Sequence, residues 1–478
     1  MRRWAGIAIL IAWVIPVLAC NFPMPSRQPQ PTLNQAAIQT LVAQQMGTAL
    51  ASPPVQPVPP TPGPTSTPIP TPTPWPFLPA PADTLPPGDP PPGELPPGLP
   101  AAMMPDSEVI YSPSSLDFQI LEYVQNAGGF LSSYQEQVDN QTLSGVEIVQ
   151  LVALETSINP RLLLAILEYQ AHWVRGQPDP SRVDYPIGFY VPGYRGLYKE
   201  LSLTAKQLGT GYYGWRQGTI SSLEFPDFTR LPLDPALNAG SVALQYLFST
   251  LFNEGLWREK LFGPESFSTL YQQMYGDALL RSALVEPLFP TGLVQPVLEL
   301  PFLPGERWSF TAGPHNAWAT GSPRGGIDFA PVTGEPACAV SRAWVTASAS
   351  GLVVRSSRNT VVIDLDGDGY EQTGWTLVYL HLADHERVAL GAWVETDDRL
   401  GHPSCEGGRA TGTNVHMARK YNGEWLPAES AQPFVLSGWV VRAGERAYEG
   451  YLINGDQVVE ARPDGSHTSI IVRAAGFQ

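Results

Sequence analysis

The sequence predicts a multidomain chain in which an all-α domain is followed by an antiparallel β domain, behind an exported and disordered N-terminal region. An apolar run and a proline-rich stretch come first, and apolar residues then recur at helical spacing from residue 106 to 290. From 291 to 478, short β-branched runs alternate with glycine and aspartate turns. The length of 478 residues allows two or three cores. The formal net charge of −16 argues against nucleic acid as a partner, since phosphates would not be neutralised.

Residues 1–20, MRRWAGIAILIAWVIPVLAC, have the build of a secretory signal, with two arginines before an apolar run that ends at a small residue and a cysteine. The stretch 17–20 resembles the lipobox of bacterial lipoproteins. That resemblance implies that Cys20 carries lipid and anchors the exported protein at the outer face of the cell membrane. An uncleaved anchor helix is the alternative, and it also predicts export and attachment to a membrane.

Residues 21–105 are predicted to be a linker. A short amphipathic segment comes first, and the stretch from about 53 onward holds much of the chain's 51 prolines. Proline at this density excludes helices and sheet ladders and favours polyproline II. About 50 such residues at about 3.1 Å each can span on the order of 150 Å. This reach suits a target in the cell wall, although a plain spacer or a glycosylated stalk would have the same composition.

The domain from 106 to 290 is predicted to be helical because four of its segments repeat apolar residues at i, i+3 and i+4. Asn159-Pro160 is a good helix start, since proline suits the first turn. The four segments are 144–158, 159–174, 197–218 and 236–252.

Two of these segments, INPRLLLAILEYQAHWV and LNAGSVALQYL, resemble the lysozyme-like lytic transglycosylases. The resemblance places the catalytic glutamate position at Gln170, which cannot protonate a glycosidic oxygen. Glu168 lies two residues away and faces elsewhere on a helix. We therefore expect a glycan-binding or scaffolding module rather than a second enzyme, with a helical spacer as the alternative. Tyr212, Tyr213 and Trp215 suit sugar stacking, but aromatic side chains of this kind are more often core.

The β domain holds three histidines at positions that fit together, namely His315, His381 and His416, together with Asp328, which follows the first of them by 13 residues. The segments GGIDFAP, VTASASGLVV, LVYLHL, GAWVETDDRLG and TGTNVHMA resemble the lysostaphin/LytM-type zinc endopeptidases, which cut cell-wall peptides. The resemblance covers about residues 300 to 425. In the commoner branch of this family the first zinc ligand precedes the aspartate by four residues, but here that position is Arg324, which cannot bind zinc.

The staphylolysin-like branch places this ligand on a longer upstream loop, and His315 fits that arrangement. The resemblance therefore implies one zinc ion held by His315, Asp328 and His416, with His381 as the catalytic histidine of a Tyr-x-His-Leu strand. Three protein ligands leave the fourth tetrahedral position open for water. The alternative is that each histidine is an ordinary core or surface residue.

The family's His-x-His pair is incomplete, because Asn414 stands at the position of its first histidine. Residues two apart on a strand share a face, so Asn414 is expected to point into the site with His416. An amide cannot act as a general base but can donate a hydrogen bond to an oxyanion. Loss of a general acid or base costs about 10²–10⁴-fold in rate. His402 is a candidate spatial substitute, and His385 and His467 are expected to be solvated.

The two remaining cysteines, Cys338 and Cys405, are predicted to form a disulfide, since an even pair remains in an oxidising compartment once Cys20 is lipidated. Closing a loop of this length contributes about 4 kcal/mol in the chain-entropy description. Two free buried thiols are the alternative.

The stretch DLDGDGYEQ carries Asp364, Asp366 and Asp368 at the opening spacing of a calcium loop. Its twelfth position is Trp375 rather than glutamate, so an aspartate-rich hairpin turn competes with a Ca²⁺ site.

The sequence as a whole predicts a lipid-anchored, extracytoplasmic zinc metalloendopeptidase that hydrolyses peptidoglycan peptides. The rival hypotheses are a wall-binding lipoprotein without turnover and a regulator that docks on other wall hydrolases.

Overall fold

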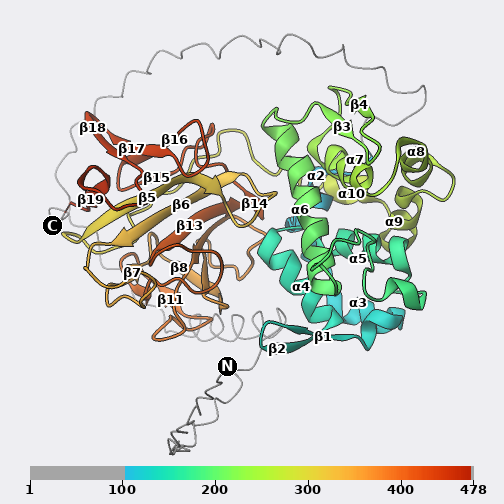
Figure 1. Cartoon of the computed structure of the whole chain (residues 1–478), viewed down its shortest axis with the longest axis horizontal. Coiled ribbons are helices and arrows are strands. Elements are labelled where there is room, and N and C mark those ends of the chain that lie inside the picture. The colour runs from blue at the N-terminus through green and yellow to red at the C-terminus, as the bar shows by residue number, and fades with distance from the viewer. Residues whose placement is uncertain (1–102, 475–478) are drawn as a thin grey trace, which may run out of the picture.

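The computed structural model describes residues 103–474, which form a helical domain beside a β domain (Figure 1). The predicted signal, Cys20 and the proline-rich linker lie outside these residues. Within the described part, none of the helices combines the length and the apolar character that crossing a bilayer requires.

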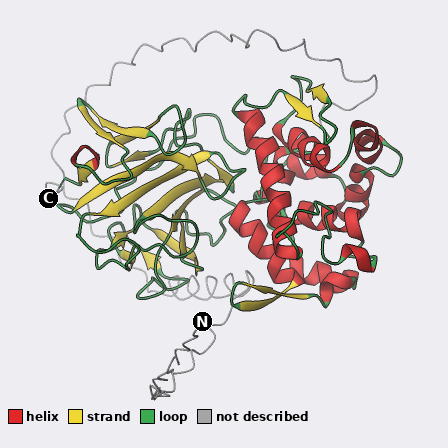
Figure 2. Ribbon diagram, viewed as in Figure 1, coloured by secondary structure: helices red, strands yellow, loops and turns green. Residues whose placement is uncertain are grey.

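The helical domain contains the four predicted helices and several shorter ones (Figure 2). The prediction of an all-α domain is wrong in one respect, because the domain also contains two short antiparallel hairpins. The first hairpin turns at Asp139, whose φ of 53° lies in the left-handed region that aspartate tolerates in tight turns. The helices are α2 Asp106–Val109, α3 Ile120–Ala127, α4 Gly145–Thr156, α5 Pro160–Ala171, α6 Leu197–Arg216, α7 Ala239–Leu251, α8 Glu254–Phe262, α9 Phe267–Tyr275 and α10 Ala278–Ser282. The hairpins are β1 Gln135–Val138 with β2 Gln141–Ser144, and β3 Ser222–Glu224 with β4 Arg230–Pro232.

Local sequence accounts for the ends of the central helices. Ser144 and Glu147 form a capping box at the start of α4. Asn159 accepts a hydrogen bond from the backbone N–H of Arg161, and Pro160 occupies the first turn of α5 as predicted.

The β domain is antiparallel, as predicted, and is built on a nine-stranded sheet with the order β11-β8-β9-β10-β13-β6-β5-β19, from which β14 pairs with β13. Its strands are β5 Arg307–Asn316, β6 Arg324–Pro331, β8 Gly351–Ser357, β9 Thr360–Asp364, β10 Trp375–Leu380, β11 Trp393–Val394, β13 Val415–Tyr421, β14 Glu424–Trp425 and β19 Ile470–Val472. A two-stranded sheet pairs β7 Val345–Thr346 with β12 Arg399–Gly401.

The C-terminal segment folds as a four-stranded sheet in the order β15-β16-β17-β18. Its strands are β15 Val435–Leu436, β16 Trp439–Ala443, β17 Gly450–Asn454 and β18 Gln457–Glu460. The predicted tight turn at Asn454-Gly455 joins the last two strands, with Asn454 paired to Gln457 and Gly455 at a φ of 57°.

The two domains share a hydrophobic core. Val354, Val362, Val378 and Ala418, on four neighbouring strands, belong to the same buried cluster as the helices α4 to α7. The alternate residues of these strands, such as Val353 and Ile363, belong to a second cluster on the other side of the sheet.

Polar contacts also join the two domains. Tyr213 on α6 accepts a hydrogen bond from the backbone N–H of Trp425 at 3.1 Å. Arg358 pairs with Asp139 at 2.7 Å and with Glu155 at 3.4 Å. The helical domain and the β domain therefore form a single folded unit, and the boundary at 290/291 stays a prediction.

Candidate metal centre and active site

Three adjacent strands bring the predicted zinc ligands together. Asp328 on β6 lies opposite His416 on β13, and His315 on β5 lies opposite Gly326 on β6. The expectation that His315 sits on a loop is wrong, because it occupies a strand. The pairing of β5 with β6 shifts register between Ala312 and His315 and again after His315, and such irregularities re-aim a side chain within a strand.

The ligand atoms of this triad converge within 4.8 Å. Nε2 of His315 lies 3.0 Å from Nδ1 of His416, and the same Nδ1 lies 3.0 Å from Oδ1 of Asp328. The third separation, from His315 Nε2 to Asp328 Oδ1, is 3.3 Å. Tetrahedral zinc with ligands at about 2.0–2.1 Å holds its ligand atoms about 3.3 Å apart. The donor set and its spacing therefore fit zinc after movements of a few tenths of an ångström.

Backbone carbonyls assign the tautomer of the two histidines predicted to be ligands. Nδ1 of His315 lies 2.9 Å from the carbonyl oxygen of Gly313, and Nε2 of His416 lies 2.9 Å from that of Ala317. Each of these nitrogens donates its proton to the carbonyl, so the other nitrogen presents a lone pair to the centre. Two lone pairs and a carboxylate that face one another at this distance repel unless a cation lies between them.

Packing around the triad leaves its rings little freedom. A Cβ on Gly326 would lie 2.1 Å from Cε1 of His416, so the glycine makes room for the ring. The ring of Tyr448, a residue that the sequence did not single out, stacks on His315 with centroids 4.4 Å apart. Arg324 donates hydrogen bonds to the carbonyls of Pro314 at 3.2 Å and Gly444 at 3.0 Å, which ties β5 to the C-terminal sheet.

The two histidines control the charge of the aspartate. Burial alone would raise the pKa of Asp328, but the charge and the N–H donors that His315 and His416 carry when they are protonated hold that pKa well below its usual range. Burial likewise works to lower the pKa of His315, and the Asp328 carboxylate outweighs it, so the pKa of His315 is raised. Asp328 is thus an anion at neutral pH, as a metal ligand must be.

His381 does not lie on a strand as predicted. It is the first residue after β10, at a left-handed φ of 69°, with 5 % of its surface exposed. Its ring centroid lies 6.4 Å from that of His416. Nδ1 donates to the carbonyl of Glu406 at 2.8 Å, so Nε2 is the proton acceptor, and burial lowers the pKa of His381. The ring is therefore neutral at pH 7 and able to accept a proton.

Asn414 directly precedes β13, two residues before His416, and its backbone N–H donates to the carbonyl of Ser404 at 3.2 Å. Its Oδ1 is buried and finds no hydrogen-bond partner among residues 103–474. This orphaned buried oxygen lies two residues before the predicted zinc ligand His416 and can accept a hydrogen bond from a substrate.

His402 does not stand in for the missing histidine. It is held between the Ala343 carbonyl at 2.8 Å and Glu386 Oε2 at 3.1 Å, and it packs on Trp344.

The Cys338–Cys405 disulfide is present, which confirms the predicted pairing. Cys405 lies between two residues that hold His381. The backbone N–H and the hydroxyl of Ser404 each donate to the His381 carbonyl at 2.8 Å, and the Glu406 carbonyl accepts from the His381 ring. The disulfide therefore anchors the segment that orients the candidate catalytic histidine.

The aspartate loop between β9 and β10 folds as a hairpin turn. Carboxylate oxygens of Asp364, Asp366 and Asp368 lie within 4.8 Å of one another. Asp364 also accepts from the Gly369 N–H at 2.8 Å, and Asp368 accepts from the Thr373 hydroxyl at 2.7 Å. Burial, together with the neighbouring carboxylates, raises the pKa of Asp364 to about 8. The turn thus has its own hydrogen bonds, and calcium binding stays a prediction.

The aromatic residues proposed to stack on sugars belong to the core. Tyr212 is fully buried and donates to Oε2 of Glu424 at 3.1 Å, Tyr213 exposes 5 %, and Trp215 Nε1 donates to the Leu237 carbonyl at 3.0 Å. Glu168 is buried as well and accepts from the backbone N–H groups of Val174 and Arg175, both at 2.9 Å.

Comparison with known proteins matches two parts of the chain. Residues 322–427 match the model of peptidase family M23, and residues 102–287 match the model described as the N-terminal domain of LasA. The C-terminal domain is thus a LytM-type metallopeptidase domain, a class that depends on zinc.

The curated proteins that the chain resembles are two sequences of Protease LasA, from Pseudomonas aeruginosa strains UCBPP-PA14 and PAO1. Each is 25 % identical to this chain, over 293 and 295 residues respectively. Each match covers 58 % of this chain and 66 % of the relative, slightly less than two thirds of the relative's length.

Solved structures also resemble part of the chain. The M23 metalloprotease pseudoalterin from the deep sea shows 21 % identity and a TM-score of 0.30, over 35 % of this chain and 96 % of its own. A zinc-containing peptidase from Vibrio cholerae shows 22 % identity and a TM-score of 0.21, over 29 % and 41 %. The catalytic domain of lysostaphin from Staphylococcus simulans shows 19 % identity and a TM-score of 0.19, and the match covers 26 % of this chain and 89 % of that chain.

Proposed function

We propose that the chain is a zinc metalloendopeptidase that hydrolyses peptide bonds in peptidoglycan, with one zinc ion per chain held by His315, Asp328 and His416. The observation that carries this proposal is the convergence of two histidine lone pairs and an ionised carboxylate within 4.8 Å. The match to peptidase family M23 supports the same reaction class.

The residues around the centre divide the proton chemistry between them. When bound, zinc supplies Lewis-acid chemistry that acidifies water and polarises a peptide carbonyl. His381, neutral and fixed by the Glu406 carbonyl, accepts a proton at Nε2 and returns it to the leaving amine. Its depressed pKa keeps it in the basic form at neutral pH.

Asn414 takes a different role from the histidine of the family's pair. Its amide does not titrate near neutral pH, so it orients a substrate group or donates a hydrogen bond to a developing oxyanion. Loss of a second titrating group predicts turnover about 10²–10⁴-fold below that of a site with both histidines.

We further propose that the protein acts outside the cytoplasm, anchored through lipid on Cys20 to the outer face of the cell membrane. The N-terminal sequence supports this anchoring, and the resemblance to Protease LasA supports a proteolytic role. The proline-rich stretch before residue 106 would then carry the folded unit from the membrane toward the wall.

The alternative function is a wall-binding lipoprotein, or a regulator of other wall hydrolases, that keeps the metal but has lost turnover. The presence of Asn414 in place of histidine is the observation that favours it.

The test uses the full chain, incubated with peptidoglycan and with a glycine-rich peptide, with zinc or with a chelator, while new amino groups are counted. We expect chelator-sensitive release that His381→Ala abolishes. The matched control is His385→Ala, because the His385 side chain is 74 % exposed and its ion pair is with Glu386, not with a member of the triad. No release from a chain that binds one zinc would establish the alternative. An Asn414→His variant that gains large activity would then mark a degenerate site.

A further inference from the structure

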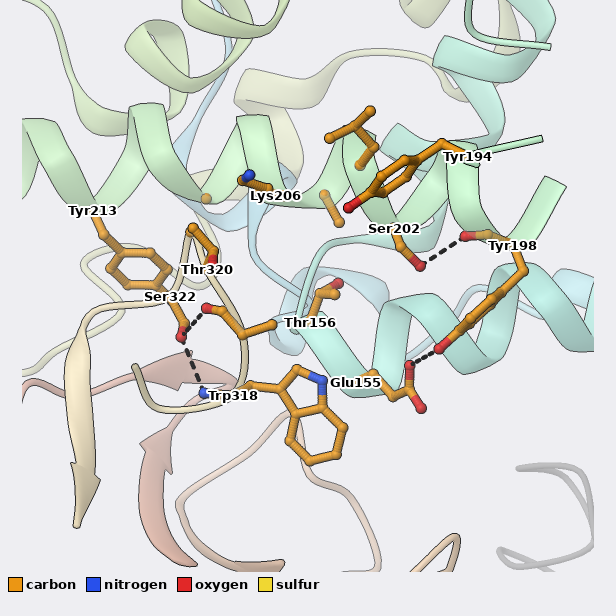
Figure 3. A pocket seen from close by; sticks show the side chains of 15 residues that line it. Glu155, Thr156, Tyr194, Tyr198, Ser202, Lys206, Tyr213, Trp318, Thr320 and Ser322 are labelled. Atoms are coloured by element: carbon orange, nitrogen blue, oxygen red, sulfur yellow. Dashed lines mark hydrogen bonds between the residues drawn. The ribbon is translucent and has the colours of Figure 1, made fainter. Parts of the chain in front are cut away.

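A pocket of about 270 Å³ lies between the two domains (Figure 3). Helices α4 and α6 and the segment before α6 form one side, and the turn 318–322, which joins β5 to β6, forms the other. This volume lies just below the range of drug-sized sites and suits a ligand with a single ring.

The walls of this pocket are fixed before any ligand arrives. A Cβ on Gly209 of α6 would lie 2.5 Å from the carbonyl oxygen of Gly321, so the two backbones touch. Tyr198 is held by a 3.0 Å hydrogen bond to Glu155, and the Ser322 hydroxyl accepts from the Trp318 N–H at 3.0 Å (Figure 3). A pre-formed site loses little conformational entropy when a ligand binds.

The lining combines aromatic rings with polar groups that have no protein partner. Tyr194, Tyr198 and Trp318 line the pocket, together with Lys206 from α6 and Thr320 from the turn 318–322 (Figure 3). Within residues 103–474, no hydrogen bond or ion pair engages the Lys206 ammonium, the Thr320 hydroxyl, the Tyr194 hydroxyl or the Trp318 indole N–H. These groups line a concave site and are open to solvent, so a ligand in the pocket can hydrogen-bond to them without breaking a bond within the protein.

The chemistry of this lining matches a sugar ring. Aromatic faces carry partial negative charge and attract the C–H faces of a pyranose, while hydroxyls pair with Thr320 and Tyr194. Lys206 and the Trp318 indole are donors, which an acetamido carbonyl accepts. Glu155 is already paired with Arg358 at 3.4 Å and accepts from Tyr198 at 3.0 Å, so Lys206 is the charged group of the lining that is left for a ligand.

We propose that this pocket binds one N-acetylhexosamine ring of the peptidoglycan glycan strand, an inference that rests on the proposed function. The turn that lines it begins beside Ala317, whose carbonyl accepts from the zinc ligand His416 at 2.9 Å. The glycan site and the peptide-cleaving site therefore lie at the two ends of one short segment. The helical domain recognises sugar through this shared pocket, which Tyr213 also lines, and not through Tyr212, which is fully buried.

The test titrates the full chain with the tetramer of N-acetylglucosamine by calorimetry. We expect saturable binding that Tyr194→Ala and Lys206→Ala each weaken by about tenfold or more, since each removes partners of a bound polar ligand. Tyr451→Ala is the matched control, because Tyr194 and Tyr451 both expose 41 % of their surface and Tyr451 lies on β17, outside the pocket. Cleavage of a sugar-free glycine-rich peptide should stay unchanged in all three variants, which also verifies that they fold.

Absence of saturable binding, or equal weakening in Tyr451→Ala, would overturn the proposal. So would displacement of the tetramer by a sugar-free stem peptide in a way that depends on Lys206, because the pocket would then bind peptide. Tetramer binding through Tyr194 and Lys206, without cleavage of any substrate, would sustain the glycan site while the proposed peptidase function fails. Peptide cleavage without tetramer binding would remove the glycan site alone.

Discussion

Opening the Cys338–Cys405 disulfide should damage catalysis more than metal binding. The relevant change is the double variant Cys338→Ser, Cys405→Ser, or mild reduction of the full chain. Ser404 and Glu406 flank Cys405 and both bond to His381, whereas the three proposed zinc ligands lie on paired strands that the disulfide does not join.

The expected loss of stability follows from the loop that the disulfide closes. The two cysteines are 67 residues apart. In the chain-entropy description such a loop contributes about 4 kcal/mol at 25 °C, which is a large fraction of the stability of a typical domain. Release of the segment also frees the His381 ring, and a general base that is no longer positioned costs about 10²-fold or more in rate.

The assay combines three measurements on the same preparation: urea unfolding, zinc per chain, and release of amino groups from a glycine-rich peptide. We expect the free energy of unfolding to fall by about 4 kcal/mol and kcat to fall steeply, while zinc stays at one per chain. Ser404→Ala, which keeps the disulfide, should lower kcat with a much smaller loss of stability. An unchanged kcat in the reduced protein would refute the link between Cys405 and His381.

Three further predictions concern single residues. Gly326→Ala should lower the zinc content per chain and destabilise the protein by about 1–3 kcal/mol, because the added Cβ would overlap the His416 ring. The control is Gly412→Ala, which should change neither quantity because the added methyl meets no atom within 4 Å. Burial raises the pKa of Glu424 from 4.5 to about 7 despite its contact with Arg216. Between these two pH values the folded state holds a proton on Glu424 that the unfolded state has lost, so the free energy of unfolding should fall by up to about 3 kcal/mol as pH rises from about 4.5 through 7. Urea unfolding at pH 5 and pH 8 should show a smaller fall in Glu424→Gln, and an equal fall would refute this cause. Glu168→Ala should cost about 2 kcal/mol in urea unfolding yet leave peptide cleavage intact, since Glu168 caps backbone N–H groups; a loss of cleavage with unchanged stability would contradict that role.

The sequence predicted those elements whose formation depends on residues close together in the chain. The four long helices and the antiparallel strands agree with it because apolar spacing, caps and turn residues act over a few positions. The disulfide was predicted on another ground, from the even pair of cysteines in an exported chain. The sequence did not predict that His315 lies on a strand. Gly313-Pro314 is typical of a break in a strand, and the register shifts that aim the His315 ring depend on the pairing with β6. The left-handed backbone of His381 was hidden for a similar reason, because it is held by residues more than 20 positions away.

Contacts between the domains were beyond sequence reasoning as well. Tyr212 and Tyr213 carry the same helical pattern whether they face a sugar or a core, and only the folded chain brings Glu424 and Trp425 onto them. The pocket around Lys206 and Trp318 arises in the same way, from segments more than 100 residues apart.

Because the two domains share a hydrophobic core, the smallest fragment expected to fold on its own includes both of them. A fragment that begins at residue 291 would leave Val354, Val362 and Val378 without their helical partners on one face of an open sheet. An exposed apolar surface of this kind promotes aggregation. Lack of activity in such a fragment would therefore reflect aggregation and would say nothing about the chemistry of the intact enzyme. Any exchange of the peptidase domain between relatives would have to carry the matching helices with it.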